Sequence, residues 1–167
     1  MNLNKAEINK ENKRNLEKLL SSLHRDHQQS LELCWVIREG IRQNVDSERI
    51  KNYANWYYIN ELEPHFEVEK EYIFSILGME NEMVKKVLTQ QRRLKKHFTK
   101  EIEVEKALSR IEEELEVLIR YEEKNIFQAI RKNIPSFEIS LNENFFLEEQ
   151  EQEQEQEQEE WNDVFWQ

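Results

Sequence analysis

The chain has 167 residues, of which 38% are hydrophobic and 35% charged, and it contains only two glycines and two prolines. So few turn-forming residues exclude sandwiches, barrels and most α/β folds, which need many tight turns. The formal net charge is −11, and residues 148–167 supply nine of these negative charges, so the rest of the chain is close to neutral. A near-neutral body with an acidic tail lacks the basic surface that nucleic-acid binding requires, and no nucleic-acid partner is expected.

Four long helices are predicted from the 3.6-residue spacing of the apolar side chains, over residues 6–40, 47–77, 80–98 and 100–132. Gly40 and Gly78 stand where helix C-termini favour glycine, and Pro135 ends the last helix. Pro64 falls inside the second helix and should bend it or begin a new segment. Short connections favour antiparallel neighbours, so we expect an all-α, up-down-up-down four-helix bundle over residues 1–135.

The chain beyond Pro135 divides into three parts. Residues 136–147 hold several apolar side chains and are predicted to pack on the bundle as a short helix or an extended strap. Residues 148–160 are almost entirely Glu and Gln, and a run with so little apolar surface is predicted to be disordered or a solvated single helix. Residues 161–167, from Trp161 to Gln167, contain three aromatic side chains. Two alternatives remain open for them: docking on a protein partner or a second copy, or folding back onto the bundle.

Location and reaction class follow from features that the sequence lacks. No apolar run approaches the ~18 residues needed to cross a bilayer, so no membrane-spanning segment is expected. The first residues lack the basic start and apolar stretch of a secretory signal, and the single Cys34 cannot form an internal disulfide, so the expected location is cytoplasmic. No Gly-rich phosphate loop, Gly-x-Ser-x-Gly or Cys-x-x-Cys motif is present, so an ordinary metabolic enzyme is not expected.

Each predicted helix carries a polar side chain with ligand atoms on its apolar face. These side chains are His27 on the first helix, His65 and Glu69 on the second, Gln91 on the third and Glu122 on the fourth. His65 and Glu69 are one helical turn apart, so both project from the same face. A buried carboxylate costs several kcal/mol unless it is partnered. The pattern therefore predicts either a metal centre in the core or a closed network of hydrogen bonds there.

The segments that carry these residues resemble the hemerythrin-like (HHE cation-binding) family over about residues 15–132. They read LHRDHQQSL at 23–31, ELEPHFEVE at 61–69, LTQQRRL at 88–94 and LIRYEEKNIF at 118–127. The resemblance implies a bundle that holds one or two non-haem iron ions. It also implies a protein that binds or senses oxygen, nitric oxide or peroxide. An enzyme is not expected, and oxidase or peroxidase-like activity is the alternative that the sequence leaves open.

Carried over position by position, the resemblance implies four metal ligands: His27, His65, Glu69 and Glu122. Two of the family's usual histidines are replaced, one by Gln91 and one by Leu118. Gln91 offers an amide oxygen as an auxiliary ligand, whereas Leu118 offers no ligand atom. His24 and His97 are the other side chains that could substitute. The alternative hypothesis is a metal-free bundle that acts as a protein–protein interaction module through its tail.

Overall fold

The structure is a computed structural model that describes residues 4–133 and 161–167. Within these ranges every regular element is a helix, so the predicted all-α class is confirmed. The elements are α1 (Lys5–Arg42), α2 (Ser47–Tyr57), η1 (Tyr58–Leu62), α3 (Glu63–Val68), η2 (Glu69–Phe74), α4 (Ser75–Leu77), α5 (Glu82–Phe98), α6 (Val104–Tyr121), η3 (Glu122–Ile126) and α7 (Phe127–Asn133). The three η elements are π-helical. The predicted strap at 136–147 and the predicted disordered run at 148–160 lie outside the described residues.

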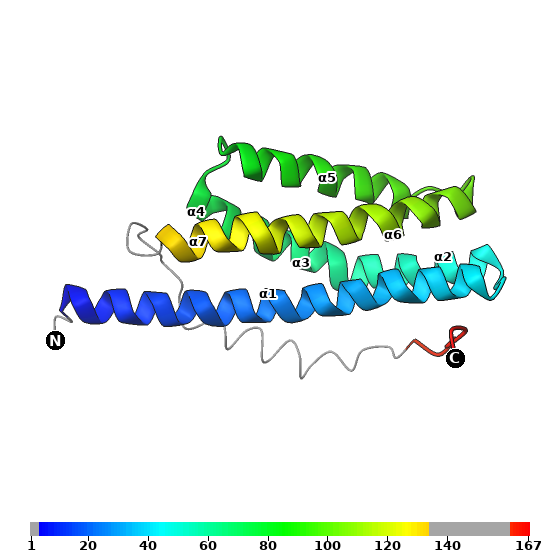
Figure 1. Ribbon diagram of the computed structural model, residues 1–167, viewed down its shortest axis with the longest axis horizontal. Helices are drawn as coiled ribbons and strands as arrows, with labels where there is room; N and C mark the ends of the chain where they lie inside the picture. Colours follow the sequence, from blue (N-terminus) through cyan, green and yellow to red (C-terminus); the bar gives the residue numbers. More distant parts are fainter. Residues whose placement is uncertain (1–3, 134–160) are drawn as a thin grey trace.

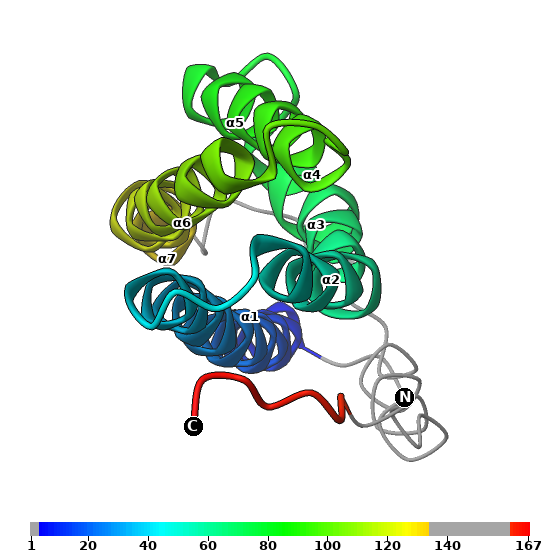
Figure 2. The ribbon, with the colours of Figure 1, turned by 90° about the vertical axis from the view of Figure 1, so that its right-hand side faces the viewer.

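Because several elements follow one another without a break, the chain forms four rods: α1, α2 to α4, α5, and α6 to α7. Figure 1 shows successive rods running back and forth along the long axis of the molecule. Figure 2, which looks along the rods, shows them arranged around a shared interior. Contacts join α6 to both α1 and α5, and α1 to α2. No helix in the described part of the chain combines the length and the apolar composition needed to cross a bilayer.

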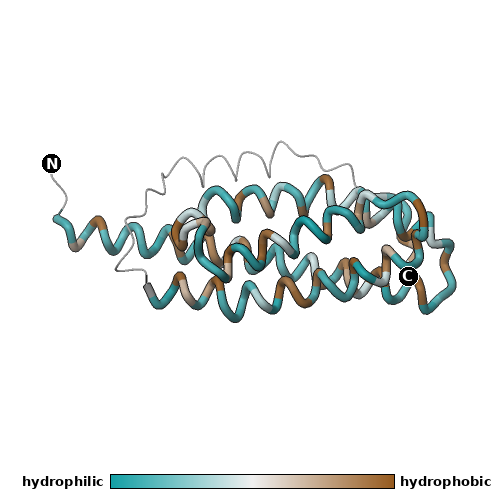
Figure 3. Tube along the Cα trace, turned by 90° about the horizontal axis from the view of Figure 1, so that it is seen from above, coloured by the Kyte–Doolittle hydropathy of each residue, from teal (hydrophilic) through white to brown (hydrophobic). Residues whose placement is uncertain are grey.

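The interior is filled by apolar side chains that recur at three- and four-residue intervals along each rod. Figure 3 shows hydrophobic positions alternating with longer hydrophilic stretches on every rod. In α1, for example, Leu16, Leu20 and Leu23 are almost fully buried. Cys34 belongs to the same core, and burial raises the pKa of its thiol to about 12. This periodicity fixes which face of each rod points inward, and therefore which polar residues are buried with it.

The end of α1 differs from the prediction. The helix ends at Arg42, and the left-handed residue that follows it is Asn44, with φ of 56°. The amide of Val45 donates to Gly40 O at 2.9 Å and that of Asn44 donates to Ile41 O at 3.1 Å, which is the Schellman pattern. Asn tolerates the left-handed region better than most residues. Asn44 therefore takes the position that the sequence assigned to a glycine.

Gly40 is instead a site of close approach inside the last turns of α1. A Cβ atom on it would lie 2.9 Å from Ile50 Cδ1 and 3.0 Å from the ring of Phe165. Any larger residue would displace one of these side chains. Gly78, in contrast, follows α4 with φ of 91°, as expected for a glycine that ends a helix.

The second rod contains the break that Pro64 predicts. Pro64 lies in the first turn of α3, directly after the π-helical segment η1. The amide of Glu63 bonds to Tyr58 O, five residues earlier. Since Pro64 has no amide hydrogen and would clash with the carbonyl four residues earlier in a regular α-helix, this wider turn accommodates it.

Candidate metal centre

Four side chains of the predicted site meet in the interior of the bundle: His27 of α1, His65 of α3, Glu69 of η2 and Glu122 of η3. One ligand atom from each lies within 4.8 Å of the ligand atoms of the other three. None of the four residues is more than 5% exposed. The structure thus brings together residues from three rods that are up to 95 positions apart in the sequence.

Local helix geometry places the two carboxylates. Glu69 is the first residue of η2 and Glu122 is the first residue of η3, so each stands where the helix changes from α to π geometry. His65 lies one turn before Glu69 on the same rod. Short π-helical segments concentrate at functional sites, because the extra residue re-aims side chains that a regular helix would direct elsewhere.

Each buried histidine is held from its outer side by a carboxylate. His27 Nδ1 lies 2.7 Å from Glu123 Oε1, and His65 Nδ1 lies 2.9 Å from Asp26 Oδ2. Because an ionised carboxylate can only accept, Nδ1 carries the hydrogen in both contacts. When the imidazole is neutral, the lone pair of Nε2 then faces the interior. Metal-binding histidines are oriented in this way, with the second ring nitrogen bonded to a carboxylate or carbonyl.

The inner nitrogens face the two buried carboxylates. His27 Nε2 lies 3.1 Å from Glu122 Oε2, and His65 Nε2 lies 2.6 Å from Glu69 Oε1. The second contact is an ion pair whose geometry does not meet the criteria of a hydrogen bond. Among the described residues His65 Nε2, both Glu69 oxygens and Glu122 Oε1 have no hydrogen-bond partner. Buried polar atoms that converge without partners indicate a site for a bound cation.

The electrostatics of the site favour positive charge. Burial lowers the pKa of His27, but the bonds to Glu122 and Glu123 outweigh it and raise the value to about 9. Burial likewise opposes the charge of His65, and the neighbouring Glu69 carboxylate raises its pKa to about 10. Burial, together with the negative Glu69, raises the pKa of Glu122 to about 8. Without a metal, the site therefore holds protons at neutral pH.

The donor set fits a first-row transition metal. Two imidazoles and two carboxylates suit iron, manganese or zinc, whereas Mg²⁺ and Ca²⁺ prefer oxygen ligands alone. With metal–ligand bonds of about 2.0–2.2 Å, ligands on opposite sides of one ion stand about 4–4.4 Å apart. The observed spread of 4.8 Å lies close to that value. The four ligand atoms therefore stand near the spacing that one ion requires.

Gln91 and Leu118, the two positions where the resemblance implied replaced histidines, lie inside the bundle. Gln91 is 8% exposed, and its Nε2 has no hydrogen-bond partner within the described ranges. Leu118 is 1% exposed and belongs to the apolar core, one turn before Glu122. Gln91, and not the neighbouring Gln90, takes the buried position on α5.

Neither of the two suggested substitute histidines belongs to the cluster. His24 is exposed, and its Nδ1 lies 2.7 Å from Glu123 Oε1, the same oxygen that holds His27. His97 lies between α5 and α6, where its Nε2 is 3.1 Å from Glu114 Oε2. His24 therefore supports the site from outside, and His97 serves packing between two rods.

The sequence pattern did not identify Asp26 and Glu123 as the carboxylates that hold the two buried histidines. Each is adjacent in the chain to a residue of the cluster, and each holds a histidine from a different segment. An acidic residue directly beside a ligand on an apolar face is the signal that would have suggested them. Which histidine each one holds depends on how the rods pack.

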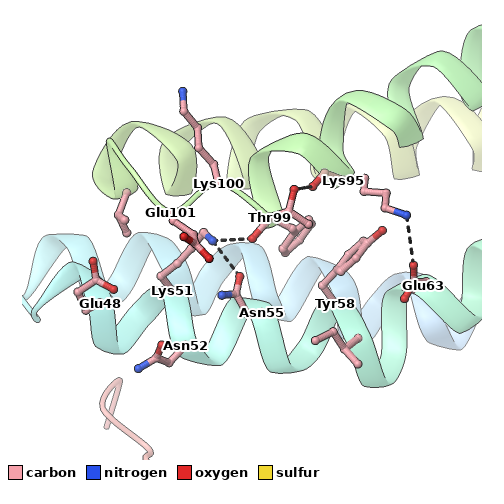
Figure 4. A pocket seen from close by; sticks show the side chains of 13 residues that line it. Glu48, Lys51, Asn52, Asn55, Tyr58, Glu63, Lys95, Thr99, Lys100 and Glu101 are labelled. Carbon is pink, nitrogen blue, oxygen red and sulfur yellow. Dashed lines mark hydrogen bonds and ion pairs between the residues drawn. The ribbon is translucent and has the colours of Figure 1, made fainter.

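A separate pocket of about 650 Å³ lies between α2, η1 and the end of α5. Figure 4 shows Lys51 at its base, with hydrogen bonds to Asn55 and to the end of the neighbouring helix. Lys51 Nζ donates to Asn55 Oδ1 at 2.9 Å and to Phe98 O at 2.5 Å. The buried ammonium thus caps the negative end of α5, which explains its burial without a ligand.

Comparison of the chain with protein-family models, curated proteins and solved structures gives no match. The function is therefore inferred from the geometry of the site.

Proposed function

We propose that this protein is a hemerythrin-like, up-down-up-down bundle that holds non-haem iron at His27, His65, Glu69 and Glu122. Its function is to bind or sense a small ligand such as oxygen, nitric oxide or peroxide. One observation carries the proposal. Two imidazoles, each held at Nδ1 by a carboxylate, direct Nε2 toward two buried carboxylates that have unpartnered oxygens.

The choice of iron follows from the number and type of ligands. Two histidines with carboxylates are the donor set of non-haem iron sites that keep open coordination positions. Four protein ligands leave about two positions of a six-coordinate ion for a small molecule. An iron ion bound there would supply these positions, and Gln91 is the auxiliary oxygen donor. Should Glu69 and Glu122 each bridge, the same residues would hold two ions.

The metal-free interaction module is the competing proposal. It requires the buried carboxylates to be satisfied by hydrogen bonds alone. By hydrogen-bond geometry, the described side chains leave three carboxylate oxygens of Glu69 and Glu122 without a partner. This observation favours a cation over a closed polar network.

The deciding experiment is metal analysis of protein expressed in iron-supplemented medium, with absorption spectra before and after exposure to air. We expect about one iron ion per chain or more, and spectral changes when nitric oxide is added to the reduced protein. A variant with both Glu69→Gln and Glu122→Gln should lose the iron. The matched control, Glu105→Gln with Glu113→Gln on the exposed face of α6, should retain it. Sub-stoichiometric iron with a featureless spectrum would contradict the proposal.

Replacing both buried carboxylates with leucine separates the two proposals further. In a metal-free bundle, the variant Glu69→Leu with Glu122→Leu should be as stable as the parent or more stable, since apolar replacement of buried charges is often neutral or stabilising. In a metal protein, the same variant should lose its ion and the stability that the ion provides. The free energy of unfolding, measured with and without added iron, distinguishes these outcomes.

A further inference from the structure

Residues 161–167, which we call the aromatic segment, lie against the same chain. Figures 1 and 2 show this segment beside the end of α1 and the start of α2. The surface it contacts is formed by Gly40, Arg49, Ile50, Tyr53 and Trp56, and we call it the α1–α2 surface. Of the two alternatives that the sequence left open, folding back is the one that the structure contains.

Aromatic rings make most of the contact. Tyr53 is central, with ring centroids 5.5 Å from Trp161, 6.1 Å from Phe165 and 4.8 Å from Trp166. Phe165 is 7% exposed, and its ring occupies the space that a Cβ on Gly40 would fill. A glycine in a helix at the point where another ring enters indicates a surface shaped for that ring.

One ion pair makes the α1–α2 surface prefer a negatively charged residue in the docked segment. Arg49 Nε donates to Asp163 Oδ2 at 3.0 Å, and Arg49 Nη2 donates to Asp163 Oδ1 at 2.6 Å. The two parallel bonds are specific for a carboxylate in this position. The guanidinium also lies 5.9 Å from the centre of the Phe165 ring. Together these contacts select an acidic residue that is flanked by aromatic residues.

The aromatic segment is held by its side chains. Its backbone is bonded internally, with Phe165 N–H donating to Asp163 O at 3.1 Å and Trp161 Nε1 donating to the same oxygen at 2.9 Å. It adds no helix or strand to the fold. This is how a short peptide ligand docks, with one buried anchor, one ion pair and flanking rings.

The connection to the bundle is long enough to release the segment. Residues 134–160 join α7 to it, and 27 residues can extend to roughly 90 Å. The α6 to α7 rod, with 30 residues, is about 45 Å long. For a tether of this length, the effective concentration of the segment at the surface is on the order of 1 mM. An intrinsic dissociation constant of about 100 μM would then keep the segment docked about nine-tenths of the time.

We propose that the α1–α2 surface is a peptide-recognition site and that the aromatic segment is its tethered, exchangeable ligand. The partner that fits this surface is a short peptide in which an acidic residue lies between aromatic residues. Such a peptide binds by displacing residues 161–167. The proposal is independent of the metal centre, since neither surface nor segment contains any of its ligands.

The test uses the full-length chain and a synthetic, fluorescently labelled peptide with the sequence of residues 161–167. In one variant, Trp161→Ala, Asp163→Ala and Phe165→Ala together vacate the surface. Fluorescence anisotropy should show the peptide binding this variant about tenfold more tightly than the wild-type chain, because the tethered segment competes only in the latter. Circular dichroism checks that the variant remains helical. Equal binding to the two chains, or no binding to the vacated chain at millimolar peptide, would overturn the proposal.

A charge exchange tests the same contact with the fold left in place. Adding Arg49→Asp to the vacated chain should weaken binding of the original peptide at least tenfold. A peptide carrying Asp163→Arg should then bind this chain better than the original peptide does. Were both peptides to bind equally, the attraction would be non-specific contact between aromatic rings, and the proposed recognition site would be wrong.

Discussion

Asp26 and Glu123 fix the two histidines of the candidate centre in one orientation. Asp26 directly precedes His27 in the chain but bonds to His65, whereas Glu123 directly follows Glu122 and bonds to His27. These crossed contacts tie α1 to α3 and to η3 at the level of the cluster. They also select the tautomer that leaves each Nε2 free for a metal.

Removing either outer carboxylate should weaken metal binding without removing a ligand. We expect Asp26→Asn and Glu123→Gln each to lower metal affinity by about 10–100-fold, the usual effect of losing a partner of a metal-bound imidazole. Competition with a chelator of known affinity measures the change. Glu32→Gln, at an exposed position on α1, is the matched control and should leave affinity unchanged. If the control and the two variants behave alike, these carboxylates do not position the histidines.

Metal affinity should also rise with pH. The pKa values of about 9 for His27, about 10 for His65 and about 8 for Glu122 mean that all three hold protons at pH 7 in the metal-free state. A metal ion must displace these protons, so raising the pH reduces the competition. We expect release of up to three protons per ion and at least a tenfold gain in affinity from pH 6 to 7. A pH-stat titration counts the protons, and a pH-independent affinity would contradict this picture.

At the scale of the elements, sequence periodicity predicted which faces are buried but not where the helix geometry changes. Apolar spacing placed His27, His65 and Glu122 on inward faces, and the structure buries all three. The π-helical segments were not predicted, because over five residues an α-helical and a π-helical pattern of apolar residues are nearly the same. Gly78 ends a helix as predicted, whereas Gly40 serves a tertiary contact with Phe165 that no local pattern reveals.

The start of α6 offers a stability prediction. The sequence placed this helix from residue 100, but it begins at Val104, after Glu103 in the left-handed region with φ of 50°. That conformation costs a non-glycine residue roughly 1–2 kcal/mol. Glu103→Gly should therefore raise the free energy of unfolding by up to about 1 kcal/mol, even though it removes an exposed ion pair with Lys100, because such pairs contribute little.

The same substitution two residues later is the control. Glu105 lies in the first turn of α6, where Gly costs about 0.5–1 kcal/mol relative to a good helix former. Urea unfolding of both variants should thus give changes of opposite sign. A loss of stability in both would mean that Glu103 is not strained.

At the scale of the whole molecule, the meeting of the four polar residues at the candidate centre could be predicted from the sequence. Its four residues could be found because polar groups buried on three apolar faces have few places to meet. The docking of residues 161–167 could not be decided from the sequence. Rings that suit a partner protein suit an intramolecular surface equally well, and only the placement of Tyr53, Arg49 and Gly40 side by side distinguishes the two.

A metal ion at the centre would add a further link between three rods that apolar packing and the contacts of Asp26 and Glu123 already join. Its ligands come from α1, the second rod and η3, so the ion can bind only when all three are assembled. Binding to the folded state alone stabilises by about 2.7 kcal/mol at a metal concentration 100 times the dissociation constant. For a chain of this length, each kcal/mol raises Tm by roughly 2–4 °C. We therefore expect ferrous iron, added anaerobically, to raise Tm by about 5–10 °C.

The variant with both Glu69→Gln and Glu122→Gln decides whether that shift arises at the centre. It retains the shape of the core but removes both carboxylate charges, so iron should leave its Tm unchanged within about 1 °C. The Glu-rich residues 148–160 are present in both proteins and serve as an internal control for weak binding to acidic groups. An equal shift in the parent and the variant would place the iron on such groups and not among His27, His65, Glu69 and Glu122. A shift confined to the parent requires the ion to bind where the three rods meet.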